Sequence, residues 1–320
     1  MGKHTLLETK AYDPTDAVFG LTQEGETFHT PLSKGPHWIV AGQTGSGKSV
    51  YMNSLLISIM AHSTPDELTL FTIDPKKVEF GPYKGLPFCG ADPITEMTDA
   101  YGLLLYQVWL MDERYKLLKD AGVKNIEEYN EWFTEHKDKE GEKPRACKIP
   151  HERMKYMVSV IDEYADLVMQ ERECEDLIVR LAQKARACGI TLLIATQRPS
   201  ADIISPTIKA NVPARIGLKT TDGTNSMIVI DEGGLEKLRG YGDSIVKLVD
   251  GTMVRIQGPY ISNPEIDRIF EYFKANYPAP NPVDFKQICV DEGLAQWADD
   301  YADDVPYDER HIKKARRSRF

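Results

Sequence analysis

Eight residues near the N-terminus have the types and spacing of a phosphate-binding loop. They match the pattern G-x-x-x-x-G-K-S and are Gly42, Gln43, Thr44, Gly45, Ser46, Gly47, Lys48 and Ser49. Glycines allow backbone angles that other residues avoid, so the amide N–H groups of such a loop can turn inward around phosphates. The pattern assigns Lys48 to the β- and γ-phosphates and the Ser49 hydroxyl to Mg²⁺. The sequence therefore predicts a site for ATP and Mg²⁺.

A pair of carboxylates follows an apolar segment further along the chain. Residues 156–161 read Tyr-Met-Val-Ser-Val-Ile, and Asp162 and Glu163 come directly after them. In P-loop enzymes the first such carboxylate holds Mg²⁺ through its water shell, and the second orients or deprotonates the attacking water. An acidic pair at a strand end is common by itself. Beside a P-loop it predicts hydrolysis of the nucleotide.

Two further polar residues could act on the same nucleotide. Gln197 follows the next apolar segment, where an amide can sense the γ-phosphate and position water. Arg186 ends a predicted helix, and two interpretations of it are open. It could stabilise the helix C-terminus as a cation, or it could be an arginine finger that reaches a neighbouring subunit's nucleotide.

The elements that must position these residues alternate between strand and helix from Pro36 to about Tyr260. Near-continuous apolar strands that alternate with helices predict an α/β fold with a mostly parallel sheet and helices on both faces. The expected strands are 37–41, 68–73, 156–161, 190–196, 215–218, 244–248 and 253–257, the last two paired. The expected helices are 49–62, 95–119, 126–135, 173–188 and 264–276, and two more strands flank a turn at 23–25.

Composition describes an ordinary globular chain. It has 320 residues, 42% of them hydrophobic and 28% charged, and a formal net charge of −10. No apolar run approaches the roughly 20 residues of a membrane span, so no membrane anchor is expected. The N-terminus lacks the apolar core of a signal peptide. The five scattered cysteines suit reduced thiols in a cytoplasmic location.

Charge is segregated near the C-terminus. An acidic run between Asp299 and Glu309 precedes a basic tail made of Arg310, Lys313, Lys314, Arg316, Arg317 and Arg319. Such a tail is either a solvated end or an arm that touches nucleic acid or an acidic partner.

With these residues in place, the chain resembles the motor domain of the FtsK/SpoIIIE DNA translocases, within the wider FtsK–HerA group. The resemblance extends over about residues 36–260. Its most specific part is the run Ala-Thr-Gln-Arg-Pro-Ser at 195–200, at its distance from the carboxylate pair. The other matching segments are 37–49, 73–76, 113–116, 162–167, 180–187 and 208–216.

This resemblance implies a RecA-like P-loop ATPase core that forms a homo-oligomeric ring and drives double-stranded DNA through its pore. A hexamer is expected, with a pentamer as the alternative. The resemblance places Lys48, Ser49, Asp162, Glu163 and Gln197 in the ATP site. It also implies that Arg186 acts on a neighbour's nucleotide and that Arg198 contacts DNA from a pore loop.

A second pore loop departs from the family. The family usually carries Ser-Lys-Ile-Asp-Ser-Arg there, whereas residues 222–227 read Asp-Gly-Thr-Asn-Ser-Met, with Gly223 and Met227 at the two basic positions. Lys219 is the nearest cation and a candidate DNA contact. The loop either grips DNA through backbone N–H groups, Thr and Asn, or grips it weakly, or does not touch it.

The sequence divides into an N-terminal leader (1–35), a RecA-like motor domain (36–276) and a C-terminal extension (277–320). The expected function is ATP-driven translocation of double-stranded DNA by a ring. Packaging of a phage genome, with a portal or another recruiting protein as partner, uses the same motor and is one alternative. A protein-export ATPase of the type VII secretion kind is the other.

Overall fold

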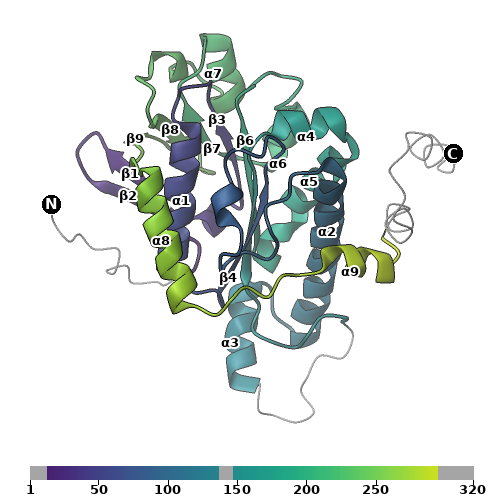
Figure 1. Ribbon diagram of the computed structural model, residues 1–320. Coiled ribbons are helices and arrows are strands. Elements are labelled where there is room, and N and C mark those ends of the chain that lie inside the picture. The colour runs from purple at the N-terminus through teal and green to yellow at the C-terminus, as the bar shows by residue number, and fades with distance from the viewer. Residues whose placement is uncertain (1–12, 137–146, 295–320) are drawn as a thin grey trace, which may run out of the picture.

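A nine-stranded β-sheet forms the centre of the computed structural model, which describes residues 13–136 and 147–294. Its strands lie in the order β2-β1-β9-β8-β7-β3-β6-β5-β4 (Figure 1). They are β1 (Asp16–Thr22), β2 (Thr27–Pro31), β3 (His37–Ala41), β4 (Leu68–Ile73), β5 (Tyr156–Ile161), β6 (Ile190–Thr196), β7 (Ala214–Leu218), β8 (Asp243–Lys247) and β9 (Met253–Gln257). The α/β class predicted from the sequence is confirmed.

The sheet has two parts that differ in strand direction. The five strands from β7 to β4 are parallel, and every residue of β3, β5 and β6 is buried. Burial on both faces explains why these strands read as continuous apolar runs. The other four strands extend the β7 edge in antiparallel pairs, and β8 pairs with β9 as predicted.

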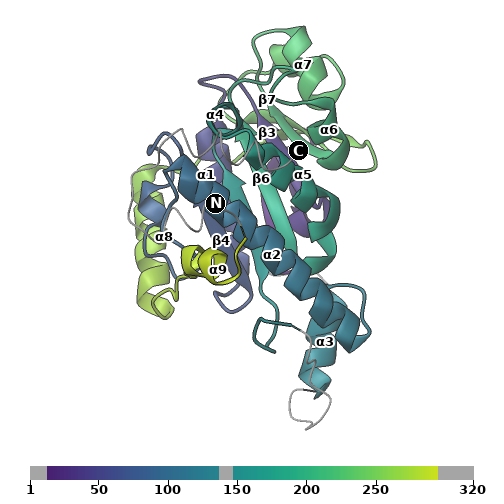
Figure 2. The ribbon, with the colours of Figure 1, turned by 90° about the vertical axis from the view of Figure 1, so that its right-hand side faces the viewer.

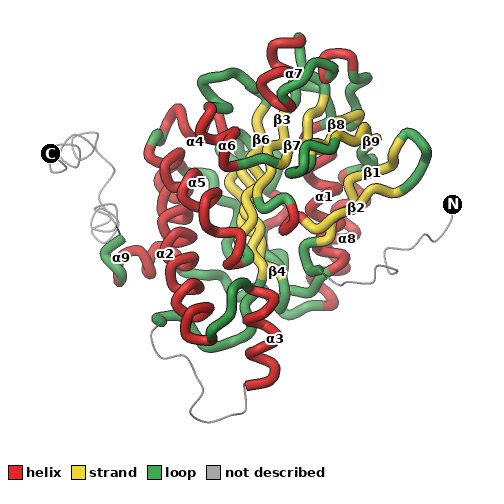
Figure 3. The backbone as a smooth tube through the Cα atoms, turned by 180° about the vertical axis from the view of Figure 1, so that it is seen from behind, coloured by secondary structure: helices red, strands yellow, loops and turns green. Residues whose placement is uncertain are grey.

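Helices cover both faces of the parallel strands. α1 and α8 lie to one side of the sheet, and α2 and α5 lie to the other (Figures 1 and 3). α7 and α3 lie at opposite ends of the molecule (Figure 2). The helices are α1 (Lys48–His62), α2 (Met97–Ala121), α3 (Ile126–His136), α4 (Tyr164–Gln170), α5 (Glu173–Lys184), α6 (Pro206–Asn211), α7 (Gly223–Ile230), α8 (Asn263–Asn276) and α9 (Phe285–Asp291).

The helix predicted over 173–188 has a different end from the one expected. The α-helix ends at Lys184, and the chain continues as the tighter 3₁₀ turn η3 (Ala185–Cys188). Gly189 closes this turn with φ 71°, a left-handed conformation that glycine adopts without strain. Arg186 therefore lies in a 3₁₀ turn directly before β6.

Both ends of the described chain pack against the rest of the fold. β1 and β2 are strands of the same sheet, and α9 packs on α2, where the Cys289 thiol lies 3.4 Å from the carbonyl oxygen of Gly102. The domain boundaries after residues 35 and 276 stay predictions. The acidic run and the basic tail lie outside the described residues. Within residues 13–136 and 147–294, no helix combines the length and apolarity that a bilayer crossing requires.

Candidate nucleotide-binding site

The predicted nucleotide residues follow neighbouring parallel strands. The phosphate-binding loop comes after β3, Asp162 and Glu163 come after β5, and Gln197 comes after β6. These strands are adjacent, and Ala41 pairs with Thr196 at their last residues. The carboxyl ends of parallel strands lie together, at what is called here the carboxyl edge of the sheet. The loop and the polar residues therefore meet there.

The loop has the backbone conformation that its glycines allow. Gly45 and Gly47 have φ of 80° and 94°, and α1 begins directly after Gly47. A second turn braces the loop, because the Gly242 amide donates to the Ser46 carbonyl oxygen over 2.9 Å. The approach is so close that a Cβ atom on Gly47 would lie 2.5 Å from the Gly242 nitrogen. This contact was not predicted from the sequence, although Gly-Tyr-Gly at 240–242 marks a turn.

Lys48 connects the loop to the carboxylate pair. Its ammonium group is buried and donates to the carbonyl oxygen and to Oδ1 of Asp162, both over 2.8 Å. The positive charge of Lys48 is thus balanced by the carboxylate that the sequence assigns to Mg²⁺.

The Ser49 hydroxyl points to a carboxylate that sequence reasoning did not assign. It donates to Oε1 of Glu79 over 2.7 Å. Asp74, at the end of β4, holds this segment by accepting the amides of Glu79 and Phe80 at 2.9 and 3.0 Å. Hydroxyl and carboxylate oxygens are ligands that Mg²⁺ accepts, so the residues around Ser49 fit this ion.

Glu163 is fully buried and held by three neighbours. Its Oε1 accepts the Thr196 hydroxyl over 2.6 Å, and its two oxygens lie 3.2 Å from the Gln197 amide nitrogen. Lys76 donates to Oε2 over 3.2 Å. The Gln197 side chain reaches the phosphate-binding loop and accepts the Thr44 hydroxyl over 2.8 Å. Lys48, Asp162, Glu163 and Gln197 are therefore brought together.

Lys76 is a second residue at this site to which the sequence analysis assigned no role. Its ammonium group lies 3.2 Å from Glu163 and 3.5 Å from Asp166. Partial burial works against its charged form, but the two carboxylates outweigh burial and raise the pKa of Lys76. The signal in the sequence was Asp-Pro-Lys at 74–76, polar residues at the carboxyl end of a buried strand.

Arg186 lies at the opposite end of the parallel strands, where their amino termini are. Its turn precedes β6, whereas the nucleotide residues follow the parallel strands. Its positive charge acts on the pKa of His37, the first residue of β3. Complete burial, together with the charge of Arg186, lowers the pKa of His37 to about 3. The structure does not bring exposed Arg186 to the phosphate-binding loop of its own chain.

α2 holds the turn that presents Arg186. The buried guanidinium of Arg114 donates to the carbonyl oxygens of Cys188 and Lys155 at 2.6 and 2.8 Å. The Tyr115 hydroxyl donates to the carbonyl oxygen of Lys184 over 2.6 Å. These bonds fix the turn on both sides of Arg186, and they give two residues of the matching segment 113–116 a structural role.

The two predicted DNA contacts lie at the carboxyl edge. Arg198 is exposed, and its guanidinium lies 3.8 Å from Asp166. The backbone of Lys219 is tied to the nucleotide loop, because its carbonyl oxygen accepts the Gln43 amide over 2.8 Å. Lys219 therefore lies beside the phosphate-binding loop, before the α7 segment that carries Gly223 and Met227.

An ion cluster anchors the far end of α7. Asp231 has φ 64° and ends the helix, and its carboxylate lies 2.8 Å from both Arg215 and Lys247. Lys209 pairs with its other oxygen. Although partial burial favours the neutral acid, these three cations hold the pKa of Asp231 far below the usual carboxyl range.

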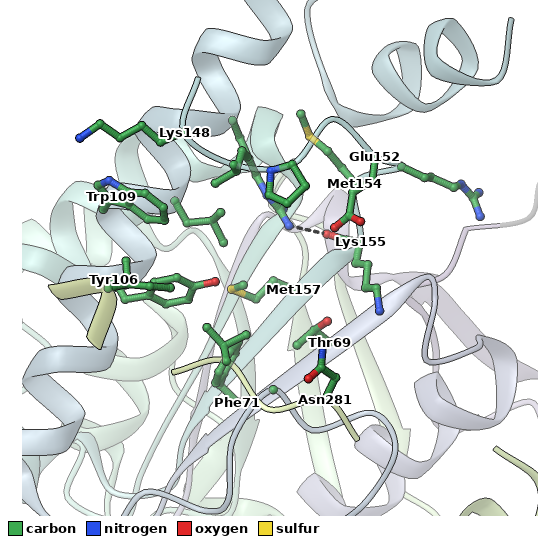
Figure 4. Close-up of a pocket in the computed structure, with 18 of the residues that line it drawn as sticks. Thr69, Phe71, Tyr106, Trp109, Lys148, Glu152, Met154, Lys155, Met157 and Asn281 are labelled. Carbon is green, nitrogen blue, oxygen red and sulfur yellow. Dashed lines mark hydrogen bonds between the residues drawn. The ribbon is translucent and has the colours of Figure 1, made fainter. Parts of the chain in front are cut away.

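A separate cavity of about 490 Å³ lies at the amino ends of β4 and β5 (Figure 4). Phe71, Tyr106, Trp109 and Met157 gather on its apolar side, and Lys148 and Glu152 lie at its lining. None of the predicted site residues lines this cavity.

Known proteins match the chain in sequence over most of its length. The model of the FtsK/SpoIIIE family matches residues 7–201. The DNA translocase SftA of Bacillus subtilis (strain 168) is 41% identical over 284 residues, covering 88% of this chain and 28% of SftA. The DNA translocase FtsK of Bacillus anthracis is 42% identical over 302 residues, covering 90% of this chain and 37% of that protein. The chain thus spans about a third of the length of these relatives.

Solved structures agree with the fold. The pCW3 conjugation coupling protein TcpA, solved as a monomer with ATPgS, superposes with a TM-score of 0.68 at 30% identity, covering 82% of this chain and 72% of TcpA. The cytoplasmic domain of the Thermomonospora curvata type VII secretion ATPase EccC has a TM-score of 0.71, covering 87% of this chain and 34% of EccC. At 22% identity, EccC supports the fold alone. The family model and the identity to the translocases show that this chain belongs to the FtsK/SpoIIIE family.

Proposed function

We propose that this chain hydrolyses ATP with Mg²⁺ and uses the energy to move double-stranded DNA, working as a homo-oligomeric ring. The observation that carries the proposal is the meeting of Lys48, Asp162, Glu163 and Gln197 at one edge of the sheet, around a loop with the phosphate-binding conformation. The names of the sequence relatives, all DNA translocases, support DNA as the load.

In this proposal each residue has a role that its position allows. Loop amides and Lys48 bind the phosphates, and Lys48 exchanges its bond to Asp162 for the β- and γ-phosphate oxygens. When bound, Mg²⁺ would be held by Ser49 and Asp162 and would neutralise charge on the phosphates. Glu163 accepts a proton from the attacking water, and Gln197 senses the γ-phosphate.

Arg186 completes the site of a neighbouring subunit. Its position at the amino edge of the sheet leaves the nucleotide of its own chain out of reach, whereas a ring can bring it to the next subunit's carboxyl edge. A hexamer is the ring that the family resemblance favours. Arg198 and Lys219 are the proposed DNA contacts, because both lie at the edge that carries the nucleotide.

ATP hydrolysis by the purified chain, measured with and without long duplex DNA at low salt, tests this function. Duplex DNA should raise the rate severalfold, and added salt should reduce the effect because phosphate contacts are salt-dependent. Sedimentation of the same sample with nucleotide and DNA reports the oligomer. An ATPase rate that long duplex DNA does not change at low salt would overturn the translocase proposal and favour a different load.

A further inference from the structure

An ion network joins the proposed catalytic carboxylate to the proposed DNA contact. Lys76 stands between Glu163 and Asp166, at 3.2 and 3.5 Å. Asp166 divides its oxygens, with Oδ2 near Lys76 and Oδ1 3.8 Å from Arg198. Two carboxylates and two cations therefore alternate from the buried site to the exposed arginine.

The backbone makes a second, shorter connection between the same two ends. The Thr196 hydroxyl donates to Glu163 over 2.6 Å and accepts the Arg198 amide over 3.0 Å. Arg198 is thus linked to Glu163 through its backbone as well as through Asp166 and Lys76. A displacement of Arg198 can therefore affect Glu163 through two sets of contacts.

Glu163 is restrained by hydrogen bonds on several sides. Its oxygens accept from Lys76, Thr196 and the Gln197 amide, and the side chain is fully buried. A carboxylate whose oxygens already accept several hydrogen bonds has fewer lone pairs left for a water molecule. Loss of the Lys76 bond would free Oε2 of Glu163 for a water molecule.

We propose that Lys76 is a positioning residue that restrains Glu163 until DNA engages Arg198, and that Asp166 then draws Lys76 away. When a DNA phosphate takes the Arg198 guanidinium, Asp166 loses one of its two cations and attracts the other more strongly. Lys76 shifts from Glu163 toward Asp166, and Glu163 becomes available to water. The mechanism, which rests on the proposed function, couples the load to hydrolysis inside one subunit.

The test uses Lys76→Met in the full chain, with ATPase rates measured with and without long duplex DNA. The restraint comes from a partly exposed ion pair, so its loss should raise the DNA-free rate about two- to fivefold. Stimulation by DNA should fall by a similar factor, because in this variant Glu163 is already free of the bond to Lys76. Asp166→Asn should also lose stimulation, but without a rise in the DNA-free rate, while DNA affinity, measured by fluorescence anisotropy, is retained.

Matched controls separate the network from general loss of charge. Lys77→Met removes the neighbouring lysine, which pairs with Glu96 over 2.7 Å and does not touch Glu163, and Asp112→Asn removes one half of an exposed pair with Arg180. Both should behave as wild type. Lys76→Arg keeps a cation at the same place and should keep the low DNA-free rate, and thermal unfolding checks that each variant is folded.

Two outcomes would overturn the proposal. A folded Lys76→Met variant with a wild-type DNA-free rate would show that Lys76 does not restrain Glu163. Loss of both DNA-free and DNA-dependent turnover with nucleotide binding intact would show that Lys76 assists Glu163 instead. A wild type that DNA does not stimulate would refute the proposed function and the coupling to Arg198, while the DNA-free rate of Lys76→Met would still decide the restraint.

Discussion

Arg186→Ala should abolish the ATPase activity of a pure sample but not the ability of its subunits to work beside a suitable neighbour. Arg186 lies before β6 and the nucleotide residues lie after it. β6 has seven residues, which at about 3.3 Å each separate the two ends by about 20 Å. No side chain spans that length, so an arginine finger at this position would serve the nucleotide of another subunit and not its own. Removal of such a residue costs about 10³ to 10⁵ in rate.

The expected ATPase rate can be calculated for rings that contain both variants. In an equal mixture of Arg186→Ala and Glu163→Gln subunits, half of the sites keep Glu163 and half of their donating neighbours keep Arg186. About one quarter of the sites in a randomly ordered ring then contain both groups, although neither pure variant has any. The ATPase rate per subunit should recover to about one quarter of the wild-type value in rings where each subunit turns over independently.

The assay mixes the two variants in the denatured or monomeric state, forms rings with nucleotide and DNA, and follows phosphate release. Arg180→Ala removes an exposed arginine of the preceding helix α5 and serves as the matched control, which should be active alone. If labelled subunits prove to be mixed within rings and the rate stays at that of the pure variants, the assignment of Arg186 to a neighbour's site is wrong.

Three further predictions test the site and its supports. Glu163→Gln should still bind ATP, because it leaves the phosphate-binding loop intact, but should lose turnover; fluorescent nucleotide binding and phosphate release measure the two separately. Asp231→Asn should lower the free energy of unfolding by about 1 kcal/mol near neutral pH, a modest value because the carboxylate is partly exposed and its ion pairs are screened. Since the pKa of Asp231 is lowered in the folded state, this stabilisation is fully present above about pH 4 and is lost as the pH falls further, so urea unfolding should show the two proteins converging in acid. Gly47→Ala should weaken nucleotide binding far more than Gly45→Ala, because both have positive φ but only the Cβ on Gly47 meets backbone, at the Gly242 nitrogen; equal losses would show that strain alone decides.

Much of the fold could be predicted because burial leaves a pattern along the chain. β4, β5, β6 and β9 have the bounds that the sequence predicts, since strands buried on both faces must be apolar throughout and the β9 hairpin has a clear turn. The end of α5 was less predictable. A helix and a 3₁₀ turn share nearly the same side-chain pattern, so only the hydrogen bonds show that Arg186 lies in the tighter turn.

The part of the site that could be predicted consists of residues that lie close together in the sequence. A phosphate-binding loop is contiguous, and its glycines, Lys48 and Ser49 are identified by their order alone. The partners Lys76, Glu79 and Gly242 are far from their targets along the chain, and their residue types are common on any surface. Nothing in their local sequence states which carboxylate or loop they meet.

The sequence by itself therefore determined the chemistry: a phosphate loop, a carboxylate pair and the strands that end at them. Only the tertiary structure decided which residues from distant parts of the chain lie around that chemistry and which lie far from it. Lys76 forms an ion pair with Glu163, and the backbone of Lys219 bonds to the phosphate-binding loop. Arg186 lies at the opposite, amino-terminal end of the parallel strands. The physical reason is that hydrogen bonds and ion pairs depend on distances of about 3 Å in space, and sequence order fixes such distances only between near neighbours.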